Sequence, residues 1–238
     1  MTVWNPWHGC RKISAGCQNC YMFRRDEAIG KDSTVIFKTK QFSLPVQMKK
    51  DGSFRLKEEG PVYTCMTSDF FLEEADAWRK EAYAMIRRRP DLDFVIITKR
   101  IDRFLESLPE DWGEGYPNVT LCVTCEDQGR ADERLPVFLD LPILHREVIH
   151  EPMLGKIDIE RYLAGGKIRR VTCGGESGPG ARVCDYDWIL FSREQCARQK
   201  VAFYFKQTGA NFRKDGKCYR IPRSLQLSQA QKAAIDLK

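Results

Sequence analysis

The sequence predicts a single α/β domain that spans residues 1–238 and folds as a partial (β/α)6 barrel. Short apolar runs recur at intervals of roughly 25 to 30 residues, helical patterns lie between them, and polar side chains follow them. Strands that alternate with helices are typical of parallel β/α units with right-handed crossovers. A doubly wound sheet is the competing arrangement, because both folds share this alternation.

Six apolar runs are expected to form the strands. Most of their residues are β-branched or aromatic, and several runs are apolar at consecutive positions, as in a parallel strand buried on both faces. The runs are Val62–Met66, Phe94–Ile97, Val119–Val123, Glu147–Ile149, Ile168–Cys173 and Val201–Phe205.

Two helices are defined by apolar residues at helical spacing. The first has Ser68 or Asp69 as its candidate cap and Pro90 as its stop, and the second has Asp185 as its candidate cap. Their apolar residues are Ala75, Trp78, Ala82 and Met85 in the first helix, and Trp188, Ile189 and Cys196 in the second.

Two segments depart from this alternation. Residues 30–60 are polar and contain the turn sequence Asp51-Gly52, so we expect an inserted loop or hairpin near the active face. Residues from about 206 to 238 form a basic C-terminal extension.

Composition narrows the class of protein. Ten cysteines in a chain without an export signal favour reduced thiols and a metal site over disulfides, and we expect a cytoplasmic protein. No apolar run is long enough to span a membrane. The net charge of +6 favours a polyanionic partner.

The strongest chemical motif lies near the N-terminus. Cys10, Cys17 and Cys20 follow a C-x6-C-x2-C spacing, and Gly9 and Gly16 each precede a cysteine, which suits tight turns. A glycine-bearing loop of this kind can direct three thiolates at an iron–sulfur cluster.

A zinc site is the alternative interpretation of this motif. Cys10, Cys17 and Cys20 with His8 would complete a Cys3His set. A second alternative pairs Cys17 and Cys20 with Cys122 and Cys125, but residues three apart in a strand point to opposite faces.

Three cysteines placed before β/α units resemble the radical S-adenosylmethionine (SAM) superfamily. The resemblance implies a [4Fe–4S] cluster on Cys10, Cys17 and Cys20, with SAM bound to the fourth iron and cleaved to a 5′-deoxyadenosyl radical. It also implies a partial TIM-like barrel with an N-terminal cluster-binding loop at residues 4–21. The first gap exceeds the commonest C-x3-C-x2-C spacing, and Asn19 replaces the aromatic residue often found before the last cysteine.

Further segments resemble a compact phage- and prophage-associated radical SAM family. They are Trp4-Asn5-Pro6-Trp7-His8-Gly9-Cys10, Ile97-Thr98-Lys99-Arg100, Glu151-Pro152-Met153-Leu154-Gly155, Gly174-Gly175-Glu176-Ser177-Gly178 and Phe205-Lys206-Gln207-Thr208-Gly209. Some members of that family are linked to thymidine hypermodification of phage DNA. The resemblance implies location in the host cell cytoplasm and a flavodoxin or ferredoxin as electron donor.

Polar residues after the predicted strands are the remaining site candidates, because this edge is the active face of a β/α barrel. A helix cap or a solvated loop is the alternative for any one of them. The candidates are Lys99, Glu151 and Glu176 for catalysis; Tyr21, Ser68, Asp69 and Glu126 for SAM; and Arg100, Lys206, Arg213 and Lys214 for substrate.

The basic extension carries interleaved aromatic residues. Basic groups can contact phosphates while rings stack on bases, so we expect contact with DNA. A solvated surface is the alternative. With no second cysteine-rich segment for another cluster, a redox-neutral reaction is favoured. Together with the resemblance, this predicts isomerisation of an amino-acid-type substituent on a modified thymine; an unmodified nucleobase or a small molecule is the alternative substrate.

Overall fold

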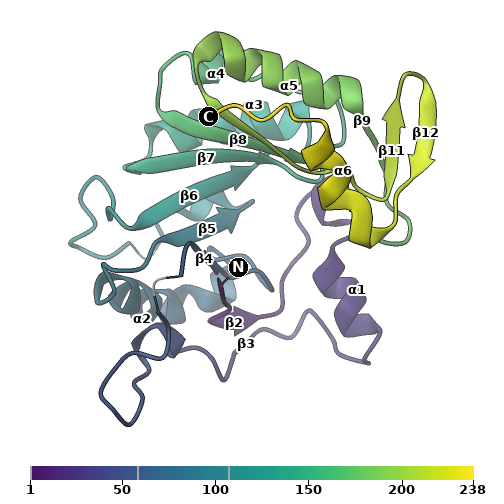
Figure 1. Cartoon of the computed structure of the whole chain (residues 1–238). Coiled ribbons are helices and arrows are strands. Elements are labelled where there is room, and N and C mark those ends of the chain that lie inside the picture. The colour runs from purple at the N-terminus through teal and green to yellow at the C-terminus, as the bar shows by residue number, and fades with distance from the viewer. Residues whose placement is uncertain (1, 58, 107) are drawn as a thin grey trace. The chain divides into compact units, whose positions relative to one another are not determined.

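The computed structural model describes residues 2–57, 59–106 and 108–238 and has a mixed α/β fold (Figure 1). One sheet has seven strands in the order β1-β4-β5-β6-β7-β8-β10. The pairs β1–β4, β4–β5, β7–β8 and β8–β10 are parallel. The strands are β1 (Thr2–Trp4), β4 (Val62–Thr64), β5 (Phe94–Thr98), β6 (Val119–Thr124), β7 (His145–His150), β8 (Ile168–Gly174) and β10 (Ala202–Gln207).

The chain divides into two compact units. The first comprises Met1–Arg11, Arg25–Cys122 and Leu141–His145, and the second comprises Lys12–Arg24, Val123–Asp140 and Arg146–Lys238. The division falls within strand β6.

The first unit is built on an aromatic core. Helix α2 (Asp76–Arg87) buries Ala82, Met85 and Ile86, and Tyr83 of this helix contacts Phe70 and Trp112 edge to face. The other elements are β2 (Trp7–His8), β3 (Phe37–Lys38) and the 3-10 turns η2 (Leu44–Val46), η3 (Glu73–Ala75) and η4 (Ile101–Arg103).

The second unit has helices between its parallel strands and a small second sheet. The helices are α3 (Gln128–Asp140), α4 (Glu160–Leu163), α5 (Tyr186–Gln199) and α6 (Gln226–Lys232), with 3-10 turns η1 (Ala15–Cys17) and η5 (Arg223–Leu225). Strands β9 (Val183–Asp185), β11 (Asn211–Lys214) and β12 (Lys217–Arg220) form the small sheet in the order β12-β11-β9. Helix α1 (Tyr21–Glu27) begins after Cys20.

All six predicted strands are present in the seven-stranded sheet, and the structure adds β1 to that sheet, a strand too short to stand out in the sequence. The parallel sheet is compatible with an α/β barrel-like fold, while the count of six β/α units stays a prediction. No helix in the described ranges has both the length and the apolar character needed to cross a membrane.

The helix predictions had different outcomes. Asp185 caps α5 as expected, because its side chain accepts a hydrogen bond from the Asp187 amide. The predicted cap of the first helix is wrong: α2 begins at Asp76, after turn η3, and neither Ser68 nor Asp69 caps it. Asp69 instead accepts hydrogen bonds from the Phe71 amide and the Thr98 hydroxyl, and these bonds compete with a capping role.

The predicted insertion has little regular structure. It contains β3, η2 and a single bridge between Met48 and Phe54; its residue 58 lies outside the described residues. Arg89 holds this segment to the rest of the first unit by donating to the carbonyls of Pro45 and Leu56.

Candidate active site

Cys10 lies in the first unit on a tightly anchored stretch of backbone. The Cys10 amide donates to the Ser33 carbonyl at 2.9 Å, and the Gly9 amide donates to the Thr67 carbonyl at 3.2 Å. Gly9 has φ +91°, and a Cβ there would collide with the Val35 carbonyl oxygen. Only glycine fits this position without strain, so the turn presents Cys10 in a defined place.

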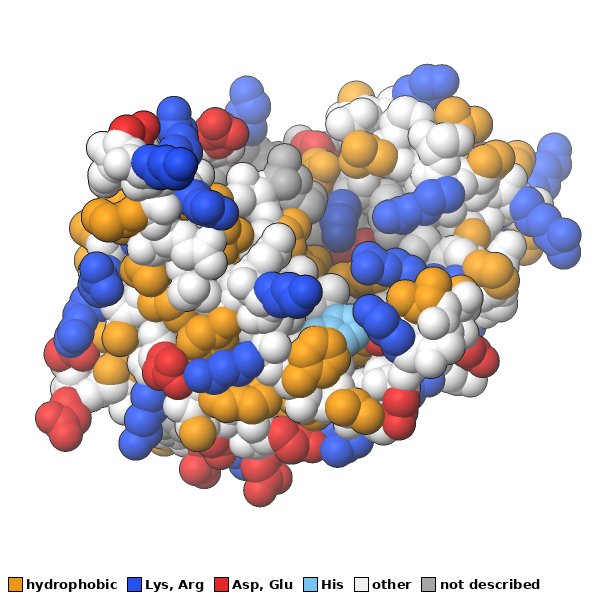
Figure 2. Space-filling model, turned by 90° about the horizontal axis from the view of Figure 1, so that it is seen from below, with side chains coloured by type: hydrophobic (Ala, Val, Ile, Leu, Met, Phe, Trp, Pro, Cys, Tyr) orange, Lys and Arg blue, Asp and Glu red, His pale blue; other side chains and the backbone are white. Residues whose placement is uncertain are grey.

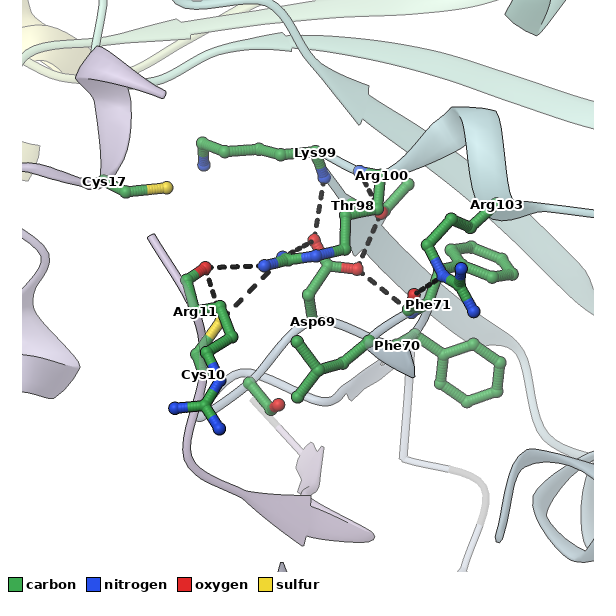
Figure 3. Close-up of polar contacts among 12 residues, drawn as sticks. Cys10, Arg11, Cys17, Asp69, Phe70, Phe71, Thr98, Lys99, Arg100 and Arg103 are labelled. Atoms are coloured by element: carbon green, nitrogen blue, oxygen red, sulfur yellow. Dashed lines mark hydrogen bonds and ion pairs between the residues drawn. The ribbon is translucent and has the colours of Figure 1, made fainter. Parts of the chain in front are cut away.

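Asp69, which follows β4, organises the polar groups around Cys10 (Figure 3). Its Oδ1 accepts from Thr98 Oγ1 at 2.7 Å, and its Oδ2 accepts from the Lys99 amide at 2.9 Å. Asp69 is 6 % exposed. Because parallel β4 and β5 end at the same edge, Asp69 meets Thr98, Lys99 and Arg100 there.

Arg100 connects Asp69 to the cysteine. Its Nη1 lies 3.3 Å from Asp69 Oδ2 and 3.9 Å from Cys10 Sγ, and its Nη2 donates to the Arg11 carbonyl at 2.6 Å (Figure 3). Burial lowers the pKa of Arg100, but Asp69 and the Cys10 sulfur outweigh burial and raise that pKa. A fixed cation beside a sulfur favours the thiolate form, which is the form that binds metal.

A second sulfur lies close to this network. Cys65, directly after β4, is buried and has a positive φ of 64°. Burial, Asp69 and Cys10 raise its pKa well above the usual value, so the Cys65 thiol stays protonated and is a poor ligand.

Cys17 and Cys20 lie in the second unit, around turn η1. The Gly16 amide donates to Glu126 Oε1 at 3.1 Å, and a Cβ at Gly16 would lie 2.9 Å from the Glu126 carboxyl carbon. Glu126 is fully buried and pairs with Arg134 Nη1 at 2.8 Å. This buried ion pair fixes the turn that carries Cys17.

Glu176, which follows β8, holds the same loop from another point. Its Oε2 accepts from Asn19 Nδ2 at 3.0 Å and from the Arg182 amide at 2.9 Å. Arg182 Nη1 in turn donates to the Ala15 carbonyl at 3.0 Å. Burial raises the pKa of Glu176, but hydrogen bonds from Arg182 and Asn19 outweigh it and lower that pKa. An ionised Glu176 therefore clamps both sides of the loop that carries Cys17 and Cys20.

A third polar group of the second unit lies at the ends of β7 and β10. Glu151 accepts from Lys206 Nζ at 2.6 Å and from Gln207 Nε2 at 2.7 Å. The Lys206 side chain is 38 % exposed, so this pair keeps access to solvent. The group offers both a cation and a carboxylate to a bound molecule.

The three cysteines of the motif differ in solvent exposure from the other seven cysteines. Cys10, Cys17 and Cys20 are half-buried, six other cysteines are buried, and Cys218 is exposed. Half-buried thiols on anchored loops fit the donor set of an iron–sulfur cluster, which needs accessible sulfurs and a defined backbone. Neither unit, taken over the described residues, holds three or more His, Cys, Asp or Glu side chains arranged for a metal ion; Cys10 belongs to one unit and Cys17 and Cys20 to the other.

The contacts of His8 are relevant to the alternative interpretation of the motif as a zinc site. Its Nε2 lies 2.7 Å from Asp26 Oδ2, and Ser33 Oγ donates to the same oxygen. Burial raises the pKa of Asp26, but hydrogen bonds from Ser33 and His8 outweigh it and lower that pKa. As a zinc ligand, His8 would have to break this pair or use Nδ1.

Comparison with known protein families assigns the chain to one of them. A family model described as a protein of unknown function, DUF5131, matches residues 1–235. The chain belongs to the DUF5131 family. No curated protein and no solved structure matches it.

The remaining predicted residues of this DUF5131 protein take varied positions. Tyr21 begins α1 and is 43 % exposed, and Ser68 Oγ donates to the Gly9 carbonyl. The side chain of Lys99 extends away from the Asp69 group (Figure 3). Arg213 pairs with Asp185, and Lys214 lies over the ring of Tyr186.

Several positioning residues escaped the sequence analysis. They are Asn19, Arg134 and Arg182, which hold the cysteine loop or its supports. Only Asn19 was detectable, because it lies inside the C-x2-C segment. Arg134 lies inside helix α3 and Arg182 in the loop before β9, and each reaches its partner through a contact between residues distant in sequence.

Proposed function

We propose that this DUF5131 protein is a radical SAM enzyme in which Cys10, Cys17 and Cys20 hold a [4Fe–4S] cluster. The observation that carries the proposal is the C-x6-C-x2-C motif, whose three cysteines are half-buried on anchored loops. When bound, the cluster and SAM would supply a 5′-deoxyadenosyl radical that abstracts hydrogen from a substrate. A flavodoxin or ferredoxin would donate the electron.

The protein's own residues would prepare this site. Arg100 places a positive charge near Cys10 and offsets the negative charge that thiolates bring. Glu126 and Glu176 orient the loop of Cys17 and Cys20 through the Gly16 amide and Asn19. Tyr21, Ser68 and Asp69 are the candidates for contact with SAM, and Glu126 is the candidate for contact with its ribose.

We further propose DNA with a modified thymine as the substrate. The support is the net charge of +6 and the absence of a second cysteine-rich segment in the sequence, which favours a redox-neutral reaction. A hydrogen would leave a carbon of an amino-acid-type substituent, the substituent would migrate, and the hydrogen would return. The ion pair of Glu151 with Lys206, whose side chain is 38 % exposed, suits the charged ends of such a substituent.

The first experiment tests the cluster. After anaerobic reconstitution, the wild type should be brown, contain iron and sulfide, and release 5′-deoxyadenosine from SAM under reducing conditions. Cys10→Ala, Cys17→Ala and Cys20→Ala should lose all three properties. Cys218→Ala is the matched control, because Cys218 is exposed and outside the motif, and it should behave as the wild type. A colourless protein that holds one zinc ion tightly would contradict the enzyme proposal and would indicate a zinc-stabilised nucleic-acid-binding module instead.

The second experiment tests the substrate. Reconstituted enzyme, SAM and reductant are incubated with DNA carrying aminoacylated 5-hydroxymethyluracil, and the DNA is digested to nucleosides for mass spectrometry. We expect an isomeric nucleoside of unchanged mass and shifted retention time. SAM cleavage that is independent of the modified DNA, with no new nucleoside, would refute this substrate and leave an unmodified base or a small molecule.

A further inference from the structure

Basic side chains do not form one continuous patch on the face seen in Figure 2; they are dispersed among hydrophobic and acidic side chains. A pocket in the second unit, in contrast, combines rings with cations. It has a volume of about 590 Å³ and lies between the β11–β12 hairpin and helix α6. This volume falls within the roughly 300–1,000 Å³ of small-molecule sites. We call it the aromatic pocket.

The floor of the aromatic pocket is a cluster of rings. Phe205 and Phe212 stack with centroids 6.0 Å apart, and Tyr186 meets Phe212 at 5.8 Å. Tyr219 lines the pocket from β12, opposite Phe212 in the strand register, and is 47 % exposed. Tyr219 is thus a ring that a ligand can cover without disturbing the core.

The rim is cationic. Lys214, Arg220 and Lys232 line the pocket, and none of its thirteen lining residues is acidic. None of these three cations forms an ion pair with a described residue. The neighbouring Arg213 points to the other face of β11 and pairs with Asp185, as alternation along a strand requires. The pocket therefore keeps its positive charge unneutralised.

We infer that the aromatic pocket binds a nucleotide unit of a single-stranded or unstacked nucleic-acid segment. Ring faces stack on nucleobases, and cations contact the flanking phosphates, which is the combination used for single strands. Gln229 adds a polar group for the base edge. The inference deepens the proposed function and rests on it for the choice of DNA, but binding needs neither cluster nor SAM.

The test is fluorescence anisotropy with a labelled oligothymidine and the full-length protein, without SAM. Tyr219→Ala should weaken binding about tenfold, and Tyr219→Phe should restore it, because stacking needs the ring and not the hydroxyl. Neutralising Lys214, Arg220 and Lys232 together should make the slope of log affinity against log salt shallower by about 2. Lys217→Ala is the matched charge control, because Lys217 is exposed on the same hairpin and does not line the pocket.

Four outcomes would overturn the inference. Equal binding by Tyr219→Ala and wild type would exclude stacking. If Lys217→Ala lost as much affinity as Lys214→Ala, only diffuse electrostatic attraction would explain the binding. The same would follow if heparin competed as well as unlabelled oligothymidine. Thymidine monophosphate that competes as well as the oligonucleotide would make this a free-nucleotide site. Thermal melting of each variant tests whether it is folded, so that a loss of binding in a folded variant can be assigned to the pocket.

Discussion

The buried Glu126–Arg134 pair offers the sharpest test of how the cysteine loop is held. Glu126→Gln keeps the shape of the side chain and removes its charge. The pair joins side chains that are 0 % and 4 % exposed, with 2.8 Å between nitrogen and oxygen. Removing one partner of such a buried pair costs about 3–5 kcal/mol, because the other charge stays desolvated. Since glutamine can still accept from Gly16, we expect the lower end, about 3 kcal/mol.

The assay is urea unfolding of the apoprotein, with a matched exposed pair as control. Arg161 and Asp132 also lie 2.8 Å apart, but their side chains are 69 % and 44 % exposed. Asp132→Asn should therefore cost less than about 1 kcal/mol. A Glu126→Gln cost as small as that of the control would refute the claim that this pair holds the loop.

Three further predictions concern the same units. Gly9→Ala should lower the free energy of unfolding by at least about 1–2 kcal/mol, because of its positive φ and the Val35 carbonyl; wild-type stability would contradict the anchored turn. Arg100→Met should bind less iron after reconstitution than Arg100→Lys, which keeps the charge, and equal iron content in wild type and Arg100→Met would remove Arg100 from the site. Burial lowers the pKa of His150 to about 4, so its folded-state pKa lies below the unfolded value and stability falls as pH drops from 6.5 towards 4. Between pH 7 and pH 5 the free energy of unfolding of the wild type should fall by about 2 kcal/mol. The fall should be smaller in His150→Gln and the same as in the wild type in His145→Gln. A His150→Gln protein that loses as much stability as the wild type would contradict this prediction.

The strands and the polar edge were predictable from local patterns. Strands buried on both faces leave continuous apolar runs, and the residues after them, such as Asp69 and Glu151, lie where parallel strands end. Strand β1 was missed because three residues carry too little pattern. The cap of α2 was missed because Asp69 bonds to β5, a partner distant in sequence.

The supports of the site could not be predicted in the same way. Arg134 lies in a helix and Arg182 in a loop, and each acts on the cysteine loop through a long-range contact. Glu126 was expected at a ribose, and the structure shows its carboxylate engaged with Gly16 and Arg134. The ribose contact stays a prediction.

The central claim is that Cys10, Cys17 and Cys20 bind one redox-active cluster. The most direct measurement is iron and sulfide content, with visible absorbance and 5′-deoxyadenosine release, for anaerobically reconstituted wild type and Cys17→Ala. We predict a brown wild type that holds iron and cleaves SAM, and a colourless Cys17→Ala that does neither. A Cys17→Ala protein with a full cluster, or a colourless wild type that holds zinc, would contradict the account.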